Sequence, residues 1–503
     1  MQASLYAQDE IAFSDYFKLT AGIRFEMPIL PTIANNENKE FLDLAKSSKT
    51  FNGMSTADMP KSRLNVSPRI GFNWDVLHNR NLIIRGGSGI YTGRIPFVWI
   101  VSAAGNSNCL QAQYIDATGK NPMTPTFHQT IDEILTDLYG GTFKAGNLAA
   151  PQSTTIMDKN LKMPTTWKTS LAVDFTLPLG IKGTVEGIYN KDLTSVSVHE
   201  LGQVQNGTIQ LPGEPQARPT WTSEGLKNSQ GSKVMPYYIT NSDKNGYYYS
   251  ITAQLKKNFS FGLDLMAAYT RSKSVVIADG LGDQISSAYN TMTYNVMGSN
   301  IDELGNSTYV SPNRFIFNAG YTIKEGNSST VLGLFYEGYN YTYIGSYSYT
   351  SYAYTISNVT GDGGAANLIY IPTQAELSKM PFTGDGQAEF EKFIQGDKYL
   401  SKHRGEYMKR GAIAAPWNSR FNFKVAQNIG IRMGQRVSTL QIGLDINNVA
   451  NLLNSNWGCL QQLSSDNILS YSNGAYTFKA PTWKKFNSTV STWNMLLTAK
   501  FTF

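Results

Sequence analysis

Residues able to carry chemistry are few and scattered in this sequence. The four histidines are His78, His128, His199 and His403; they lie far apart, with no partner histidine or cysteine at the spacing of a zinc site. Carboxylates are spread singly, as Asp264 is, and no nucleophile stands beside a base in a recognisable motif. We therefore expect no metal, no cofactor and no enzymatic activity.

The last stretch of the chain shows the element that must position whatever the protein binds. In residues 493–503 one apolar and one polar set of side chains alternate, and a strand sends alternate side chains to opposite faces. A strand of about ten residues with this period and aromatic ends is typical of an outer-membrane β-barrel. An edge strand of a large soluble β-sandwich is the alternative that one strand leaves open.

The same pattern recurs along the whole chain, and short turns alternate with long polar loops. Twelve further strands are expected at 4–13, 17–27, 66–76, 81–91, 165–177, 181–193, 246–257, 260–272, 312–323, 329–341, 417–428 and 437–448. The sequence therefore predicts an all-β fold, an antiparallel transmembrane β-barrel with about 13 strands present, long extracellular loops and short periplasmic turns. An odd strand count places the N-terminus at the extracellular end, because the C-terminus lies at the short-turn end.

Composition excludes several classes of protein. Charged residues make up 16% of the 503 residues and aromatic residues 12%, which fits neither a disordered chain nor a bundle of membrane helices. No stretch of 18 apolar residues is present, and a net charge of +6 without a basic block gives no sign of nucleic acid. The N-terminus lacks the pattern of a signal peptide, so we expect a mature fragment or a truncated product.

Several stretches carry a resemblance to a known family. LYAQDEI (5–11), LTAGIRFE (19–26) and SPRIGFNWD (67–75) resemble the barrel half of TonB-dependent outer-membrane receptors. LIYIPTQAEL (368–377) and LQIGLDINNVANLLNSNWG (440–458) resemble the Oar-like branch of that family. The similarity spans nearly the whole chain in register.

The resemblance implies a function and a set of partners. Residues 1–503 would be the C-terminal part of a 22-stranded barrel, without its plug and first strands. The protein would import a large nutrient of the peptide, glycan or siderophore class. Its partners would be outer-membrane lipid and lipopolysaccharide, the extracellular substrate, and TonB through the missing N-terminal region. A passive porin, a surface adhesin and a soluble β enzyme remain as alternatives.

Two loops and one tyrosine-rich segment hold the candidate ligand-contacting residues. Tyrosines within 336–355 would form either an aromatic platform for a ligand or, as we prefer, an aromatic girdle that continues into a hairpin. The candidate residues are Arg94, Trp99, Tyr339, Tyr341, Tyr343, Tyr347, Tyr349 and Arg404.

The segment 368–416 and the two cysteines complete the expectations. Phe390, Phe393 and Leu400 have near-helical spacing, which favours a small helical cap over the barrel mouth. Basic residues of the cap, Arg404 among them, would attract an anionic ligand or lipopolysaccharide, unless they are simply solvated. Cys109 and Cys459 both fall on the extracellular side, as a candidate disulfide or as two unpaired loop thiols.

Overall fold

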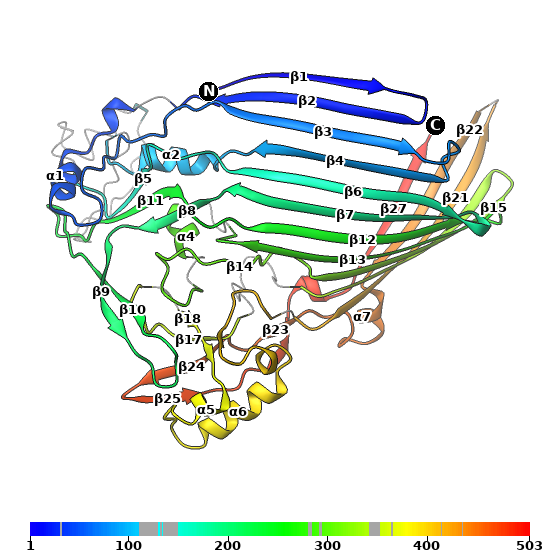
Figure 1. Ribbon diagram of the computed structural model, residues 1–503. Coiled ribbons are helices and arrows are strands. Elements are labelled where there is room, and N and C mark those ends of the chain that lie inside the picture. The colour runs from blue at the N-terminus through cyan, green and yellow to red at the C-terminus, as the bar shows by residue number, and fades with distance from the viewer. Residues whose placement is uncertain are drawn as a thin grey trace.

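Figure 1 shows the fold of the chain in a computed structural model. No helix in the described part of the chain is long and apolar enough to cross a membrane. The structure describes residues 1–30, 33–109, 129–130, 133, 149–279, 284–290, 294–341, 353–363, 366–413, 415–434 and 436–503.

One large antiparallel sheet dominates the molecule. Thirteen strands follow one another in chain order, and the short β14 (Gly305–Asn306) is added beside β13, which gives a 14-stranded sheet. The thirteen are β1 (Gln2–Ala12), β2 (Phe17–Pro28), β3 (Asn65–Asp75), β4 (Leu82–Thr92), β6 (Thr165–Leu177), β7 (Ile181–Thr194), β12 (Tyr247–Asn258), β13 (Leu263–Val276), β15 (Asn313–Glu325), β16 (Ser328–Tyr339), β21 (Asn418–Met433), β22 (Arg436–Asn447) and β27 (Asn494–Thr502).

The predicted strands are confirmed, with shifts of a few residues at their ends. The last strand begins at Asn494, after the 3-10 turn η4 (Thr489–Ser491), and the ends of β13 and β21 lie beyond the predicted positions 272 and 428, at Val276 and Met433. Among the described residues the sheet does not close, and β1 and β27 are its two ends.

The sheet has one apolar and one polar face. Leu171 on β6 is 54% exposed, and Ile70 and Ile251 are similarly exposed, so about half of each apolar side chain is left uncovered by the chain itself. On the polar face, Arg85 on β4 donates to Asp174 on β6 at 2.9 Å and to Glu186 on β7 at 3.3 Å. An apolar face left open by the chain itself is the surface that lipid covers in a membrane barrel.

Short turns and long loops lie at opposite ends of the strands. The turn between β6 and β7 is η2 (Pro178–Gly180), where Leu179 and Gly180 adopt φ angles of 65° and 71°. Figure 1 shows β1 starting at the loop end and β27 finishing at the turn end. This arrangement agrees with the prediction drawn from the odd strand count.

The loops fold into small sheets that the alternating pattern does not reveal. β5 (Ser153–Met157) and β8 (Val196–Glu200) flank β11 (Met235–Asn241), with β5 and β11 parallel. The remaining strands are the hairpin of β9 (Gln203–Ile209) and β10 (Arg218–Ser223); the sheet of β17 (Thr355–Ser357), β18 (Ala366–Leu368), β24 (Asn467–Ser472) and β25 (Ala475–Phe478); β19 (Tyr370–Ile371) with β20 (Glu406–Tyr407); and β23 (Gln461–Leu463) with β26 (Trp483–Lys485).

The α-helices of the described residues lie in the loops. The helical segment expected within 368–416 is present as α5 (Gln374–Leu377), α6 (Gly386–Gly396) and η3 (Leu400–Lys402), which we call the cap. The others are η1 (Ala34–Asn36), α1 (Lys39–Ser47), α2 (Phe97–Gly105), α4 (Ile285–Asn290) and α7 (Val449–Leu453). Thr373 and Glu376 form a capping box at the start of α5, which satisfies backbone N–H groups at that end.

The buried apolar core lies in the loops and not against the strand faces. The largest cluster of buried side chains contains Phe390 of α6 with Ile356, Leu368, Tyr476 and other loop residues. A soluble β-sandwich would bury the apolar faces of its long strands between its two sheets. Here those faces stay open while the loops supply their own core, so the arrangement is that of a membrane wall.

Candidate ligand site in the extracellular loops

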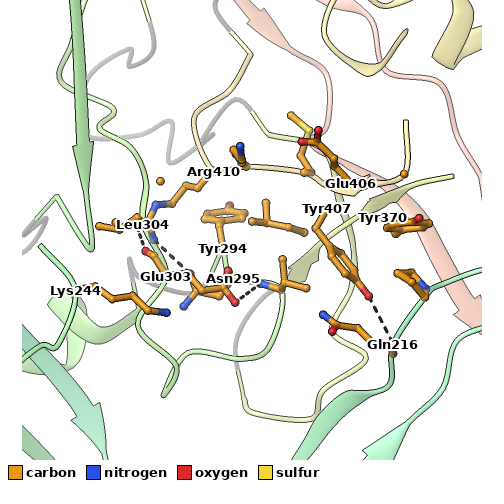
Figure 2. Close-up of a pocket in the computed structure, with 17 residues that line it drawn as sticks. Gln216, Lys244, Tyr294, Asn295, Glu303, Leu304, Tyr370, Glu406, Tyr407 and Arg410 are labelled. Carbon is orange, nitrogen blue, oxygen red and sulfur yellow. Dashed lines mark hydrogen bonds between the residues drawn. The ribbon is translucent and has the colours of Figure 1, made fainter. Parts of the chain in front are cut away.

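A cavity of about 640 Å³ opens among the long loops (Figure 2). Its lining comes from the β9–β10 hairpin, the β11–β12 connection, the β13–β15 loop and the β16–β21 loop. We call it the loop pocket; the residues that line it are Pro215, Gln216, Lys244, Tyr294, Asn295, Val296, Glu303, Leu304, Gly305, Leu368, Tyr370, Gly405, Glu406, Tyr407, Met408, Lys409 and Arg410.

Two tyrosines form one wall of the loop pocket with their hydroxyls held in place. Tyr370 and Tyr407 belong to the paired strands β19 and β20, and their ring centroids are 5.0 Å apart. The Tyr370 hydroxyl donates to Glu376 at 2.9 Å, and the Tyr407 hydroxyl donates to Glu214 at 3.0 Å. Because both hydroxyls are anchored, the rings are held in place. Tyr370 is 3% exposed, so Tyr407, which is only partly buried, is the more accessible of the two rings.

Both hydroxyls stay protonated over the physiological range. Burial, followed by the hydrogen bond to Glu376, raises the pKa of Tyr370 to about 12. Burial, followed by the charge of Glu214, also raises the pKa of Tyr407. The side of the loop pocket that Tyr370 and Tyr407 form is therefore neutral and amphipathic.

The charged groups of the loop pocket are partly used by the fold. The Lys244 ammonium donates to the carbonyl of Asp302, and Glu303 accepts hydrogen bonds from the backbone of Val296 and Met297. Arg410 is one of the basic residues within 368–416, for which the sequence left open an anion-attracting or a solvated role, but it is 5% exposed. Its guanidinium donates to the carbonyls of Val276, Ile277 and Glu303, which ties the β16–β21 loop to the end of β13.

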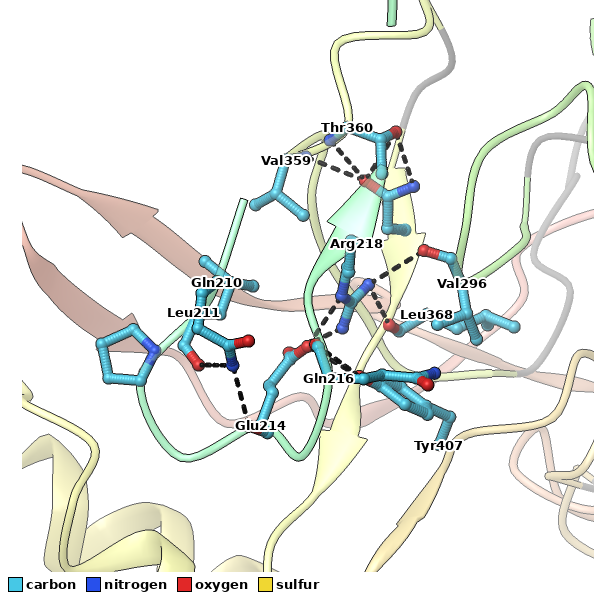
Figure 3. Close-up of polar contacts among 12 residues, drawn as sticks. Gln210, Leu211, Glu214, Gln216, Arg218, Val296, Val359, Thr360, Leu368 and Tyr407 are labelled. Carbon is cyan, nitrogen blue, oxygen red and sulfur yellow. Dashed lines mark hydrogen bonds and ion pairs between the residues drawn. The ribbon is translucent and has the colours of Figure 1, made fainter. Parts of the chain in front are cut away.

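A buried ion pair supports the loop pocket from behind (Figure 3). Arg218 donates to both carboxylate oxygens of Glu214, at 2.8 and 2.7 Å. The same guanidinium donates to the carbonyls of Leu368 at 2.9 Å and Val296 at 3.3 Å, and its Cζ lies 5.1 Å from the centre of the Tyr407 ring. These contacts join three loops around one side chain.

The residues that were singled out from the sequence and that the structure describes do not gather at this cavity. Arg94 lines a separate cavity of about 380 Å³ beside Phe97 and Ile100. Trp99 is buried in an apolar cluster, which makes it a core residue. Arg404 forms an ion pair with Glu391 at 2.8 Å and braces the cap.

The tyrosine segment is described only in part. Tyr339 and Tyr341 pack edge to face with centroids 6.0 Å apart, and Tyr341 is buried with its hydroxyl donating to the carbonyl of Gln461 at 2.6 Å. Tyr343, Tyr347 and Tyr349 lie outside the described residues. Of the five tyrosines, the two that are described therefore serve packing around the loops.

The structure contradicts the candidate disulfide, because Cys109 and Cys459 are both free thiols. Cys109 follows α2, and its sulfur lies 3.7 Å from the carbonyl of Ser107. Cys459 follows α7, and its sulfur lies 3.2 Å from the carbonyl of Ser455. Figure 1 shows α2 and α7 in separate parts of the molecule, so each thiol belongs to its own loop.

One serine, one histidine and one aspartate come together at β8 without the geometry of a nucleophilic triad. Ser197, His199 and Asp302 meet, but the same His199 nitrogen contacts both the Ser197 hydroxyl at 3.2 Å and the Asp302 carboxylate at 3.1 Å. A nucleophilic triad uses the two ring nitrogens for these two partners. No group of three or more histidine, cysteine or acidic side chains among the described residues is placed to hold a metal ion.

Fold and loops together define a class of protein. The antiparallel sheet has one apolar and one polar face, with short turns at one end of its strands and structured loops at the other. This arrangement is typical of a membrane β-barrel. The chain belongs to the outer membrane beta-barrel domain family, whose model matches residues 1–470. It is therefore a protein of the outer membrane.

Comparisons with known proteins add three solved structures. The outer membrane transporter YddB from Escherichia coli is 12% identical with a TM-score of 0.46, and the match covers 99% of this chain and 45% of that one. The ferric enterobactin receptor from Pseudomonas aeruginosa is 9% identical with a TM-score of 0.42, covering 100% and 44%. The siderophore receptor PirA from Acinetobacter baumannii is 9% identical with a TM-score of 0.41, covering 99% and 46%.

The chain spans less than half the length of the solved structures it matches. No curated protein sequence gives a significant match.

Proposed function

We propose that residues 1–503 form the C-terminal part of the barrel of a TonB-dependent outer-membrane transporter, of the Oar-like branch, that takes up a large nutrient of the peptide, glycan or siderophore class. In this proposal the barrel has 22 strands, and a plug and a TonB-contacting segment belong to the intact protein. Lipid and lipopolysaccharide surround the apolar face of the wall. The substrate meets the loops first.

The loop pocket is the single observation that favours a ligand-binding receptor over a passive barrel. A pore needs an open lumen, whereas a receptor needs a preformed surface that recognises its ligand. Here four loops build a cavity with two fixed tyrosine rings, Tyr370 and Tyr407, beside amide and charged groups such as Gln216 and Glu406. The combination of aromatic faces and convergent polar groups supports a ligand-binding role.

The experiment compares energised uptake with binding in cells that carry the intact protein. We expect uptake of the cognate nutrient to stop when TonB is deleted, while surface binding persists. Tyr407→Ala should lower binding about tenfold or more because it removes a ring from the wall. Tyr309→Ala, an exposed tyrosine of the β13–β15 loop that does not line the loop pocket, is the matched control. Uptake that persists without TonB would instead indicate a passive porin, and binding without uptake a surface adhesin.

A further inference from the structure

The pairing of the wall strands shows which charged side chains share the face of Leu171, which we call the lipid face. Residues paired across antiparallel strands lie on the same face, so the lipid face can be followed from β1 to β27. A charge in contact with lipid is costly, so a charged residue on this face needs an anionic or cationic partner or contact with water. The charged residues on the lipid face are Asp9, Lys191, Lys257, Arg271, Lys273, Glu325 and Arg436.

The sign of these charges differs between the two ends of the strands. At the turn end both signs occur, as in Lys257 at the end of β12 and Glu325 at the end of β15. At the loop end the charged residues are Lys191 on β7 and Arg271 and Lys273 on β13. On the wall strands that the structure describes, the loop end of the lipid face therefore carries positive charge only.

Arg271 and Lys273 are exposed and keep most of their hydrogen-bond donors available. Arg271 donates to Oδ1 of Asn313 at 2.8 Å, and the hydroxyl of Tyr269 donates to the same oxygen at 2.7 Å. A guanidinium has five N–H donors, so this bond leaves others for a ligand. The Lys273 ammonium lies 6.0 Å from the centre of the Tyr247 ring. In the described part of the chain, neither cation forms an ion pair with a carboxylate.

A cavity of about 260 Å³, which we call the rim cavity, is lined by both cations. It lies where the pairing along β13 is interrupted, because β15 pairs with β13 as far as Arg271 and β14 pairs with it from Val275. Its lining also includes Asn306 and Asn313, and no aspartate or glutamate is among the described residues that line it. Two cations without a neighbouring negative charge favour the binding of an anionic group.

The side chains beyond the cations, toward the turn end, match the rest of a membrane lipid. On the lipid face of β13, Arg271 is followed by Tyr269 and then by Ala267 and Leu265. Ile251 lies directly opposite Arg271 on β12 and is 55% exposed. Aromatic residues are typical of the membrane interface and apolar residues of the hydrocarbon region. Cations, an aromatic ring and apolar side chains would thus meet the phosphate, interfacial and acyl parts of a lipid in that order.

We propose that Arg271 and Lys273 bind the phosphate groups of a lipopolysaccharide molecule in the outer leaflet. Arginine forms charge-assisted, often bidentate hydrogen bonds with phosphate, and lysine attracts it as a point charge. Lys191, opposite Tyr247 on the neighbouring strand, adds positive charge, while its ammonium donates to the carbonyl of Asn245 at 2.8 Å. This proposal rests on the orientation in the proposed function, because loops outside the cell place this end of the strands in the outer leaflet.

The rim cavity and the loop pocket share two loop segments. Asn306 and Gly411 line the rim cavity, and their chain neighbours Gly305 and Arg410 line the loop pocket. The backbone N–H of Asn306 donates to the carbonyl of Arg410 at 2.9 Å, and the Asn306 amide donates to the carbonyl of Gly411 at 3.0 Å. A lipid bound at the rim cavity would therefore limit the motion of segments that shape the ligand cavity, which preorganises it.

The test measures the binding of fluorescent lipopolysaccharide to the intact protein in detergent, after bound lipid has been removed. The probe is used with its lipid A phosphates present and with them removed. We expect saturable binding of the phosphorylated probe, and an affinity about tenfold or more lower for the probe without phosphates. The double variant Arg271→Gln, Lys273→Gln should lower the affinity for the phosphorylated probe by a similar factor. Inorganic phosphate should not displace the probe, because it has no acyl chains to contact the apolar side chains.

The matched control is the double variant Lys257→Gln, Arg436→Gln, which removes the same charge from the lipid face at the turn end and should leave the affinity unchanged. Heat-modifiable mobility in gels shows that each variant keeps its folded barrel. The proposal is overturned if the folded Arg271→Gln, Lys273→Gln protein binds the phosphorylated probe as tightly as the parent, or if the control variant loses as much affinity. Displacement of the probe by inorganic phosphate would overturn the assignment to a lipid. The assay contains no TonB and no nutrient, so its failure is distinguishable from failure of the proposed function.

Discussion

The guanidinium of Arg218 is closed to solvent and donates to both carboxylate oxygens of Glu214, four residues earlier in the same hairpin. It also donates to the carbonyls of Leu368 and Val296, so one side chain joins three loops. Buried charge is tolerated only when paired and fully hydrogen-bonded. This pair holds the wall of the loop pocket in its place.

Removing one partner of the Arg218–Glu214 pair should lower the local stability of the β9–β10 hairpin. We expect Arg218→Met to reduce the local stability of residues 203–223 by about 3–5 kcal/mol, because Glu214 is left buried without its cation. Hydrogen exchange of the intact protein in detergent measures this directly. The control is Arg404→Met, which breaks the pair with Glu391 in the cap and should leave the protection of residues 203–223 unchanged. Equal protection of residues 203–223 in the parent and in Arg218→Met would refute the supporting role.

The two faces of the wall should differ in their tolerance of charge. Leu171→Arg places a cation on the lipid face and should destabilise the barrel by about 2–4 kcal/mol if the site is near mid-membrane. Ser170→Arg lies one residue away on the polar face and should cost far less, as should Thr176→Arg. Equilibrium unfolding in lipid vesicles gives the three values. Equal costs at Leu171 and Ser170 would contradict the assignment of the faces.

Protonation of Glu200 should stabilise the loops around β8. Burial, the largest effect, raises the pKa of Glu200 above its ordinary value of 4.5. The stabilisation is therefore fully present below about pH 4.5 and is lost as the pH rises through the folded-state pKa. Glu200→Gln should remove this dependence and raise the stability of the β8 region near neutral pH, as measured by hydrogen exchange. A decline of the same size in the variant would assign the effect to other groups.

The strands could be predicted from the sequence because lipid and water impose a period of two on every one of them. The small loop sheets could not. β5 and β11 pair in parallel across a long sequence separation, and their short buried strands show no alternation.

The residues that build the loop pocket could not be predicted from the sequence for a similar reason. Arg218 and Arg404 are both single arginines in polar loops, and nothing local in the sequence distinguishes the buried one from the partly exposed one. The tyrosine run that stood out supplies core packing at Tyr341. Tyr370 and Tyr407 carry no pattern of their own, because a pairing of two short strands brings them together.

The central claim is that this chain forms the wall of a barrel and that its ligand-binding loops lie outside the cell. The most direct test is to measure which end of the strands faces the cell exterior. In the intact protein, with Cys109 and Cys459 changed to serine, single cysteines are placed by Asp15→Cys in the β1–β2 turn or by Lys402→Cys in η3. The reagent is a maleimide coupled to a polymer too large to cross the outer membrane. We predict that intact cells label Lys402→Cys only, and that Asp15→Cys reacts once the outer membrane is permeabilised. Labelling of Asp15→Cys but not Lys402→Cys in intact cells would contradict the account.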